Sequence, residues 1–343
     1  MPVNRQLRLA RRPVGLIDDD TFVLHEEPLA DLEDGQYRVR VAYLSLDPTN
    51  RVWLRDEASY MPPVGIGEVM RGSGVGRVVE SRHDDFPVGT PVVGMLGWQD
   101  YATCGTGLLA RAAPPGVPLP HLLSVYGTTG ATAYFGMLDV GRPAAGDTVV
   151  VSGAAGATGS VAGQIARIRE ARVIGIAGTD EKCRWITEDL GFDGAINYRR
   201  EDVGRRLDAL CPAGVDVFFD NVGGAILDAV LTRLAIGGRV ALCGAISNYN
   251  ALDDPTPLYG YMQLVVKRAR IEGFLLLDYL DRIPEAVLQL VEWVGEGRIR
   301  WRAHIVDGLD AAPRALNMLF TGENTGKLMV RVDPSRDPTP GIL

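Results

Sequence analysis

The sequence predicts an α/β protein in which a doubly wound parallel sheet is joined to a smaller β-rich unit. Two observations predict this fold class. Before residue 126, short alternating or glycine-punctuated apolar runs follow one another, as in a small barrel-like unit. After residue 146, short apolar runs alternate with segments of helical length. Such alternation is typical of right-handed β-α-β crossovers, which build a parallel sheet covered on both faces.

The β-rich part contains four segments that predict strands, at residues 36–46, 72–80, 89–96 and 100–104. The first of them alternates in polarity and is rich in β-branched and aromatic residues. Four prolines in the segment 114–120 then predict a linker.

The second part predicts five strands and at least two helices. The strands are expected at 147–152, 171–177, 193–197, 215–220 and 239–243, and the helices at 159–170 and 181–190. From about Trp301 a strand, a helix and a strand follow, at 303–307, 310–321 and 327–332. The segment 333–343 holds three prolines and predicts a loose tail.

Length and composition narrow the classes of function. The chain has 343 residues, which predicts about two domains, and 46% of them are hydrophobic and 23% charged, as in an ordinary globular enzyme. Its formal net charge is −8 at pH 7. Because binding to a phosphate backbone needs a basic surface, we expect no nucleic-acid partner.

Cysteine usage and the absence of targeting signals favour the cytoplasm. The four cysteines show no C-x-x-C spacing, and the four histidines are scattered, so no clustered zinc site is visible. The basic start of the chain lacks the apolar stretch of a signal peptide. The most apolar segment, 149–166, is interrupted by polar residues and glycines, so we expect a buried strand-turn-helix and no membrane span.

A glycine-rich turn between a predicted strand and a predicted helix is the strongest local signal for a ligand. It resembles the dinucleotide-binding pattern G-x-G-x-x-G, with Ala154 in the place of the first glycine. Small residues let the backbone approach a pyrophosphate, whose charge is met by the N–H groups of the following helix. The alternative, a tight turn without a ligand, is disfavoured by the β-α-β context. The predicted contacts are Gly156, Ala157, Thr158 and Gly159.

The end of the second strand favours NADP over NAD. Gly178 stands at its tip, where an NAD site usually has an acidic residue, and Lys182 follows in the first turn of the next helix. An ammonium group is opposite in charge to a 2′-phosphate and can pair with it. Only three of the 35 lysines and arginines in the chain are lysines, so a lysine at this position is not typical of how the chain carries positive charge. A solvated surface lysine remains the alternative, and Asp180 argues mildly for NAD.

These residues and several other strings resemble the medium-chain dehydrogenase/reductase superfamily. The resemblance is to its zinc-independent, NADP-dependent branch, which includes prostaglandin reductases, bacterial curcumin reductase and plant alkenal double-bond reductases. The strings lie at 44–51, 127–138, 152–166, 178–182, 197–198, 219–224, 243–250, 270–274 and 322–327. The resemblance implies a GroES-like catalytic domain, 1–126 with 300–343, and a Rossmann domain at 127–299.

The resemblance also implies the remaining cofactor contacts. Lys182 matches the 2′-phosphate contact, and Tyr198 matches a contact near the adenosine. Asn221 follows the fourth strand at its carboxyl end, where doubly wound sheets bind their ligands. The nicotinamide would be lined by Cys243, Gly244, Ala245, Ile246, Ser247 and Tyr249, with Phe274, Leu275, Leu276 and Asn324 completing the pocket.

Zinc chemistry of the kind found in the alcohol dehydrogenases of the superfamily is not expected. The chain lacks the G-H-E signature, and Cys104 is interpreted as a small buried hydrophobic residue. Reduction of a C=C bond conjugated to a carbonyl needs no metal, because hydride goes to the β-carbon and a hydrogen-bond donor stabilises the enolate. Tyr249, in the C-G-x-I-S-x-Y string, is the predicted donor, shared with a cofactor ribose hydroxyl. Packing against the cofactor alone is the alternative.

The predicted function is therefore NADPH-dependent reduction of α,β-unsaturated ketones or aldehydes by a homodimer, as the resemblance implies. The alternatives are a zinc-independent NADPH:quinone oxidoreductase and a non-catalytic NADPH-binding redox sensor. Tyr60, Trp98 and Tyr261 are hypothetical walls of an apolar substrate pocket. Tyr43, Asp47 and Arg51 form a polar cluster that we interpret as structural.

Overall fold

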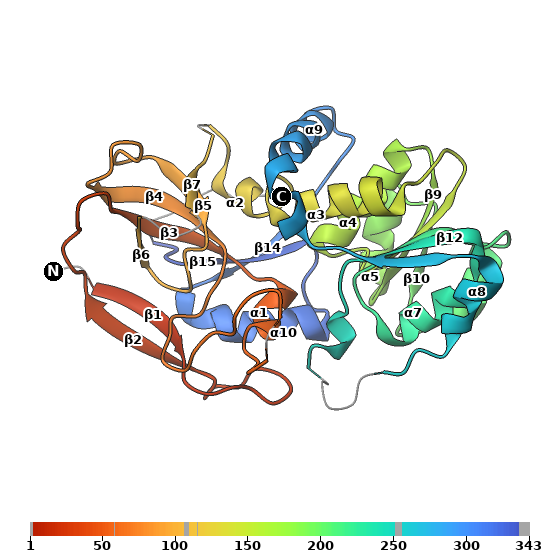
Figure 1. Ribbon diagram of the computed structural model, residues 1–343, viewed down its shortest axis with the longest axis horizontal. Coiled ribbons are helices and arrows are strands. Elements are labelled where there is room, and N and C mark those ends of the chain that lie inside the picture. Colours follow the sequence, from red (N-terminus) through yellow and green to blue (C-terminus); the bar gives the residue numbers. More distant parts are fainter. Residues whose placement is uncertain (1–2, 58, 106–109, 115, 251–255, 336–343) are drawn as a thin grey trace. The chain divides into compact units, whose positions relative to one another are not determined.

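The computed structural model describes residues 3–57, 59–105, 110–114, 116–250 and 256–335. Its contacts divide the chain into two compact units (Figure 1). Unit 1 comprises Met1–Leu123 and Ala303–Leu343, and unit 2 comprises Ser124–Arg302.

Unit 1 is built around a mixed sheet that both ends of the chain supply. Its strand order is β14 (Ala303–Asp307), β15 (Lys327–Arg331), β3 (Tyr37–Ser45), β4 (Gly74–Ser81), β5 (Pro91–Gly94) and β7 (Ala110–Ala112), and β6 (Tyr101–Cys104) also pairs with β3. Two further strands, β1 (Val3–Leu9) and β2 (Phe22–Pro28), form an antiparallel pair. Short helices α1 (Pro48–Val52), α2 (Leu119–Leu123) and α10 (Ala312–Thr321) complete the unit.

The core of unit 1 buries a tryptophan, a cysteine and a lysine side chain. Trp98 is fully buried, with its ring 5.3 Å from that of Phe22. Cys104 is also buried, as expected, and burial raises the pKa of its thiol to about 11. The buried ammonium group of Lys327 lies 2.6 Å from the carboxylate of Asp47, consistent with a structural role for the cluster that includes Asp47.

Unit 2 contains the predicted parallel sheet. Its six strands lie in the order β10 (Gly194–Asn197), β9 (Arg172–Ala177), β8 (Thr148–Ser152), β11 (Val215–Asp220), β12 (Leu234–Leu242) and β13 (Arg270–Gly273), and every neighbouring pair is parallel. In chain order this is 3-2-1-4-5-6, the order of a Rossmann sheet. The predicted fold class is confirmed.

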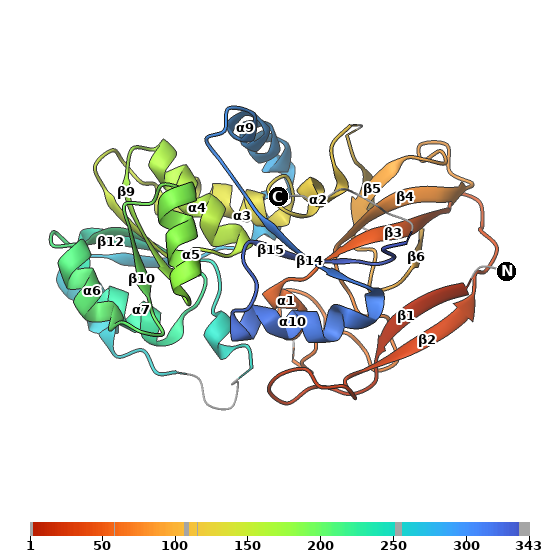
Figure 2. The same cartoon turned by 180° about the vertical axis from the view of Figure 1, so that it is seen from behind.

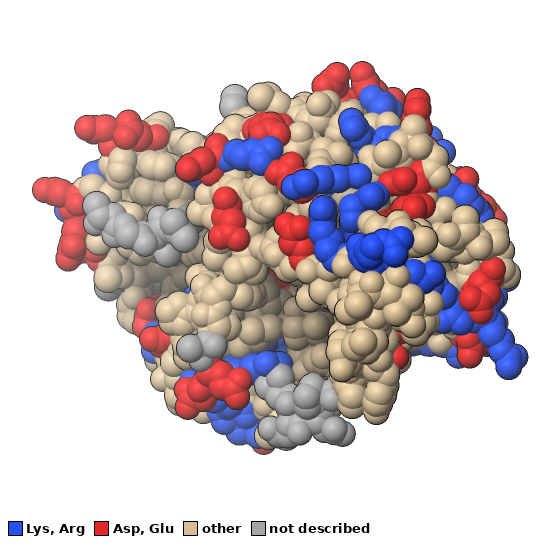
Figure 3. All heavy atoms as spheres, turned by 45° about the vertical axis from the view of Figure 1, so that its right-hand side comes forward, with Lys and Arg blue, Asp and Glu red and all other residues tan. Residues whose placement is uncertain are grey.

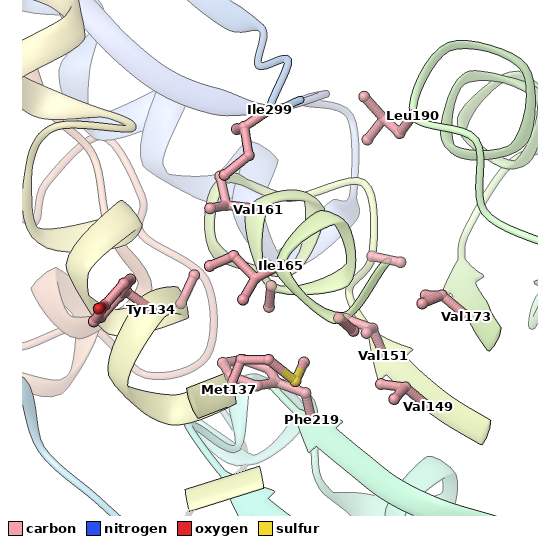
Figure 4. Packing of buried hydrophobic residues seen from close by; sticks show 14 of the residues in the cluster. Tyr134, Met137, Val149, Val151, Val161, Ile165, Val173, Leu190, Phe219 and Ile299 are labelled. Atoms are coloured by element: carbon pink, nitrogen blue, oxygen red, sulfur yellow. The ribbon is translucent and has the colours of Figure 1, made fainter. Parts of the chain in front are cut away.

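Helices cover both faces of this sheet (Figures 1 and 2). Val149 and Val151 of β8 point to one face and Val150 to the other, as the alternation of a strand requires. The first face packs against α3 (Thr128–Phe135), α4 (Ala157–Ile168) and α9 (Ile283–Gly295), and Figure 4 shows part of that cluster. The second face packs against α6 (Val203–Leu210), α7 (Gly224–Leu231) and α8 (Gln263–Lys267).

Several elements differ from the expectations. The helix expected at 181–190 is α5 (Asp180–Arg184), continued by a π-helical turn at Trp185–Asp189, and a second π-helical turn, Gly136–Gly141, follows α3. Short 3-10 turns lie at Ile246–Asn248, Gly260–Met262, Leu276–Arg282 and Leu309–Ala311. Helix α2 begins inside the expected linker, and residues 336–343 of the expected tail lie outside the described residues. Within the part of the chain that the structure describes, no helix is long and apolar enough to cross a membrane.

Candidate cofactor site

The candidate site lies at the carboxyl ends of the strands of unit 2. The strand that follows β8 in sequence, β9, lies on one side of β8, and β11 lies on the other. A crevice at such a reversal of strand order is where doubly wound sheets bind their ligands. The predicted turn 153–159, Asn221 and the loop 243–249 all follow the carboxyl ends of β8, β11 and β12.

The turn between β8 and α4 has the geometry of a phosphate-binding turn. Gly153 adopts a φ of +58°, and Gly156 precedes the first residue of α4. A Cβ atom at Gly159 would lie 2.4 Å from the carbonyl oxygen of Gly153, so only glycine fits there. The turn thus brings bare backbone to the start of a twelve-residue helix, which is the arrangement that a pyrophosphate requires.

A buried hydrogen-bonded cluster joins the ends of the first and fourth strands. The hydroxyl group of Ser152 donates to the carboxylate of Asp220 at 2.6 Å and accepts the N–H of Asn221 at 2.8 Å. The side-chain amide of Asn221 donates to the carbonyl of Ser152 at 2.7 Å. Burial raises the pKa of Asp220, while the Ser152 hydroxyl and the N–H groups of Val222 and Gly223 oppose that shift. The predicted cofactor residue Asn221 is therefore fixed to the strand that carries the phosphate turn.

The loop after β12 is tied to the same place. Four of its backbone N–H groups donate hydrogen bonds to carbonyl oxygens of the segment 220–222. The N···O distances are 2.8 Å for the N–H of Cys243, 3.1 Å for Gly244, 3.3 Å for Ile246 and 3.1 Å for Ser247. The hydroxyl group of Ser247 adds a bond of 2.7 Å to the carbonyl of Val222. The predicted nicotinamide loop is thus held along the end of β11.

Tyr249 turns its hydroxyl group back toward this loop. The phenolic oxygen accepts the N–H of Ala245 at 3.3 Å, and a Cβ atom at Gly244 would lie 3.1 Å from that oxygen. An oxygen that accepts a backbone N–H still carries its own O–H, so this phenol can act as a donor. The structure therefore brings the predicted donor together with two of the predicted cofactor residues.

The adenosine end of the site gathers a tyrosine and two cations beyond β9. A Cβ atom at Gly178 would lie 3.1 Å from the ring of Tyr198, so the tyrosine packs directly against the tip of the second strand. The guanidinium of Arg199 lies 5.8 Å from the centre of that ring. Burial, and next the positive charge of Arg199, lower the pKa of the half-buried Lys182. Two neighbouring cations at this position fit a doubly charged 2′-phosphate.

Arg199 is a candidate that sequence reasoning missed. The signal was present, because Arg199 and Arg200 form a basic pair directly after the predicted contact Tyr198. Asp180, which argued for NAD, has its Oδ1 bound by the side-chain amide of Asn197 at 2.6 Å and its Oδ2 paired with Arg200. Both oxygens of this carboxylate are engaged with the third strand and the turn after it.

The predicted substrate-pocket residues and Asn324 are divided between the two units, unlike the cofactor residues described above, which all lie in unit 2. Trp98 is a core side chain of unit 1 with no exposed surface, so its assignment to a pocket wall was wrong. Tyr60, also in unit 1, is exposed and its hydroxyl group pairs with that of Thr49. Tyr261 is 56% exposed in unit 2. Asn324 lies in unit 1 between α10 and β15, where its side-chain amide donates to the carbonyl of Gly326 at 3.1 Å.

The segment after β13 also reaches the carboxyl edge of the sheet. Phe274 packs edge-to-face on Phe219 of β11, with ring centres 6.2 Å apart, and fills the space beside Gly136, where a Cβ atom would lie 2.2 Å from its ring. Leu275 is exposed and Leu276 is half-buried. Because Gly273 pairs with Leu242, this segment follows the strand next to the one that carries the loop 243–249. Across the described residues no group of three His, Cys, Asp or Glu side chains could hold a metal ion.

Family models match both parts of the chain. A model described as the N-terminal domain of oxidoreductase matches residues 5–110, and one described as zinc-binding dehydrogenase matches residues 157–293. The second match contains the last three residues of the phosphate turn, Lys182, Asn221 and the loop 243–249.

Named relatives cover nearly all of the chain. An NADPH-dependent curcumin reductase of Escherichia coli is 43% identical over 336 residues, which is 96% of this chain and 97% of the relative. An NADP(+)-dependent 2-alkenal reductase of Nicotiana tabacum is 39% identical over 297 residues, 86% of each chain. The crystal structure of CurA from Vibrio vulnificus in complex with NADPH aligns with a TM-score of 0.91 at 41% identity, covering 96% of this chain and 99% of that one.

Proposed function

Because this chain belongs to the NADP-dependent branch of the medium-chain dehydrogenase/reductase family, we propose that it reduces the C=C bond of α,β-unsaturated ketones or aldehydes. The chain is an NADP-dependent oxidoreductase, and relatives of similar length are named as reductases of curcumin and of 2-alkenals. The observation that carries the proposal is the loop 243–249, which hydrogen bonds to the end of β11 and presents a tyrosine hydroxyl group there.

The residues of unit 2 fit NADPH along the whole carboxyl edge of the sheet. The turn 156–159 would bind the pyrophosphate, and Lys182, Arg199 and Tyr198 would bind the 2′-phosphate and adenosine. Asn221, Phe274 and the loop 243–249 would orient the nicotinamide. When bound, NADPH supplies a hydride ion to the substrate.

The protein's chemical contribution is to stabilise charge on the substrate and to position the reactants. As the β-carbon of an enone accepts hydride, negative charge builds on the carbonyl oxygen, and the α-carbon then takes a proton to complete the reduction. The hydroxyl group of Tyr249 donates a hydrogen bond to that oxygen, and its position is set by the bond from Ala245 and by the anchored loop. The apolar side chains of Phe274 and Leu276 exclude water from the same region, which strengthens the hydrogen bond.

We also propose that two copies associate through the edge of the unit 2 sheet. Within the described residues β13 pairs with β12 alone, and Arg270–Gly273 therefore offers unpaired backbone groups. Exposed apolar side chains lie before and after this strand, namely Met262, Val265, Val266, Leu277 and Leu280. The double substitution Val265→Asp and Val266→Asp is expected to convert the dimer to a monomer, as measured by analytical ultracentrifugation. The control Val88→Asp, at a similarly exposed valine of unit 1, is expected to leave the dimer intact.

We place this activity in the cytoplasm, on a small-molecule substrate. The four cysteines are free thiols, as expected in a reducing compartment. On the face shown in Figure 3, Lys and Arg side chains gather in one area but are flanked by Asp and Glu. With a formal net charge of −8, that mixture disfavours a nucleic-acid partner.

The test is the loss of NADPH absorbance with a panel of four acceptors, and with NADH run alongside. The panel holds a medium-chain 2-alkenal, an aryl enone, a benzoquinone and a saturated aldehyde. We expect turnover of the first two with NADPH and none of the saturated aldehyde. Turnover of the quinone alone would assign the chain to the quinone reductases, and NADPH binding without any turnover would indicate a sensor.

A further inference from the structure

Asp180 lies where an acidic residue would oppose the binding of a 2′-phosphate. It is the first residue of α5, two positions beyond the tip of β9, and Lys182 lies on the same helical turn. In NAD sites an acid near this strand end accepts hydrogen bonds from the ribose diol, and its charge repels a phosphate. The sequence therefore places an NAD-type group within an NADP-type site.

The structure shows what occupies that carboxylate. Oδ1 of Asp180 accepts a hydrogen bond of 2.6 Å from the side-chain amide of Asn197, and Oδ2 forms an ion pair with Arg200. Asn197 is the last residue of β10 and pairs in register with Ala177, the last residue of β9. The pairing of the second and third strands thus brings both partners to the acid.

This ion pair contributes little to folding. The side chain of Arg200 is 73% exposed and that of Asp180 is 48% exposed. Exposed pairs of this kind add little to the free energy of unfolding, because water and salt screen them. The charges of the pair still act on a ligand that binds beside them. Lys182 lies on the same helical turn as Asp180, and Arg199 directly precedes Arg200 in the sequence.

We propose that Arg200 is a positioning residue for cofactor choice, which holds the Asp180 carboxylate against Asn197 and cancels its charge so that the 2′-phosphate meets only Lys182 and Arg199. This inference rests on the proposed function, because it assumes that NADPH binds at this end of the sheet. It gives Arg200 no direct contact with the cofactor. The preference for NADPH over NADH then depends on a pair of side chains outside the phosphate contacts.

The test compares dissociation constants for NADPH and NADH, measured by fluorescence titration without any substrate. In Arg200→Ala the released carboxylate repels the 2′-phosphate, so the constant for NADPH rises about 3- to 10-fold. The constant for NADH stays the same or falls, because the freed acid can accept the ribose hydroxyl groups. Arg200→Lys keeps the charge and keeps the preference.

A second substitution separates an indirect role from a direct one. Asp180→Asn alone leaves the charge of Arg200 uncompensated, so the constant for NADPH stays the same or falls. Combined with Arg200→Ala it restores the preference to within about twofold of the wild type. Arg205→Ala, which removes an exposed arginine of α6, is the matched control and leaves both constants unchanged. All variants should melt within about 2 °C of the wild type, since the pair is exposed.

Two outcomes would overturn the inference. An unchanged NADPH-to-NADH ratio in Arg200→Ala would show that the pair has no role in cofactor choice. The same loss in Arg200→Ala and in the double variant would show that Arg200 contacts the phosphate directly. A wild-type chain that bound no NADPH would instead remove the proposed function, and the inference with it.

Discussion

The hydroxyl group of Ser152 lies 2.6 Å from the carboxylate of Asp220, although 68 residues of chain separate them. Ser152 precedes the phosphate turn, and Asp220 is the first residue of the segment 220–222 that anchors the loop 243–249. One buried hydrogen bond therefore connects the part of the site that fits the pyrophosphate with the part that fits the nicotinamide.

Ser152→Ala is expected to destabilise the protein and to weaken NADPH binding. It removes a donor from a fully buried carboxylate, which costs about 1–3 kcal/mol of the free energy of unfolding. Urea unfolding and NADPH titration measure the two effects. Ser160→Ala serves as the control, because that hydroxyl group has only a 3.4 Å contact with the carbonyl of Ala157. Equal unfolding curves for Ser152→Ala and the wild type would refute the role of this bond.

Gly159→Ala is expected to abolish cofactor binding. The added methyl group would lie 2.4 Å from the carbonyl oxygen of Gly153, so the phosphate turn must open. We expect the dissociation constant for NADPH to rise at least about 100-fold, since the pyrophosphate contacts depend on that turn. Gly295→Ala, at a helical glycine with open space around it, is the matched control. Near-normal binding by Gly159→Ala would mean that the turn does not hold the pyrophosphate.

Lys182→Ala is expected to weaken NADPH binding by about 1–3 kcal/mol and to leave NADH binding nearly unchanged. The experiment also has a pH signature. Burial and the charge of Arg199 lower the pKa of Lys182, and a bound phosphate would raise it again. The affinity for NADPH should therefore fall as the pH rises through the lowered pKa, and this alkaline decrease should disappear in Lys182→Ala. Equal weakening of both cofactors would contradict the assignment.

Tyr249→Phe is expected to lower kcat for enones roughly 10- to 100-fold, because a donor to the developing enolate is lost. The dissociation constant for NADPH should change much less. It is measured by titrating each variant with NADPH in the absence of substrate. Tyr259→Phe, at an exposed tyrosine of the same unit, should leave kcat unchanged. Full turnover of every accepted enone by Tyr249→Phe would leave the ribose hydroxyl group as the donor.

Strands that are rich in valine and phenylalanine and are followed by turn residues were predictable from the sequence. The strand expected at 215–220 is β11 residue for residue, because its run of valine and phenylalanine ends in clear turn signals. β12 begins at Leu234 instead of 239, since Ile236 and the two glycines after it resemble a turn. Helix α9 was missed, although Ala286, Leu290 and Trp293 lie at helical spacing on its buried side.

For the candidate site, the sequence identified the charged and polar side chains but did not show which of them contact each other. Lys182 and Asp180 pointed to opposite cofactors, and only the register of β9 on β10 brings Asn197 to the acid. Trp98 shows the same limit in unit 1. A tryptophan in a loop next to a glycine can line a pocket or fill a core. Which of the two it does depends on residues far away in the sequence, here Phe22, that pack against it in the fold.

The use of both chain ends in unit 1 has a consequence for biosynthesis. Residues Tyr43–Ser45 of β3 pair with β15, and Lys327 of β15 contacts Asp47 across 280 residues of chain. At a synthesis rate of about 5–20 residues per second, that interval lasts roughly 14–56 s on the ribosome. All of unit 2 is synthesised during it, so most of the nucleotide-binding unit can begin to fold while this edge of β3 is still without its partner strand. A nascent chain is therefore most exposed to misassembly and to chaperones at that edge until β15 has been made.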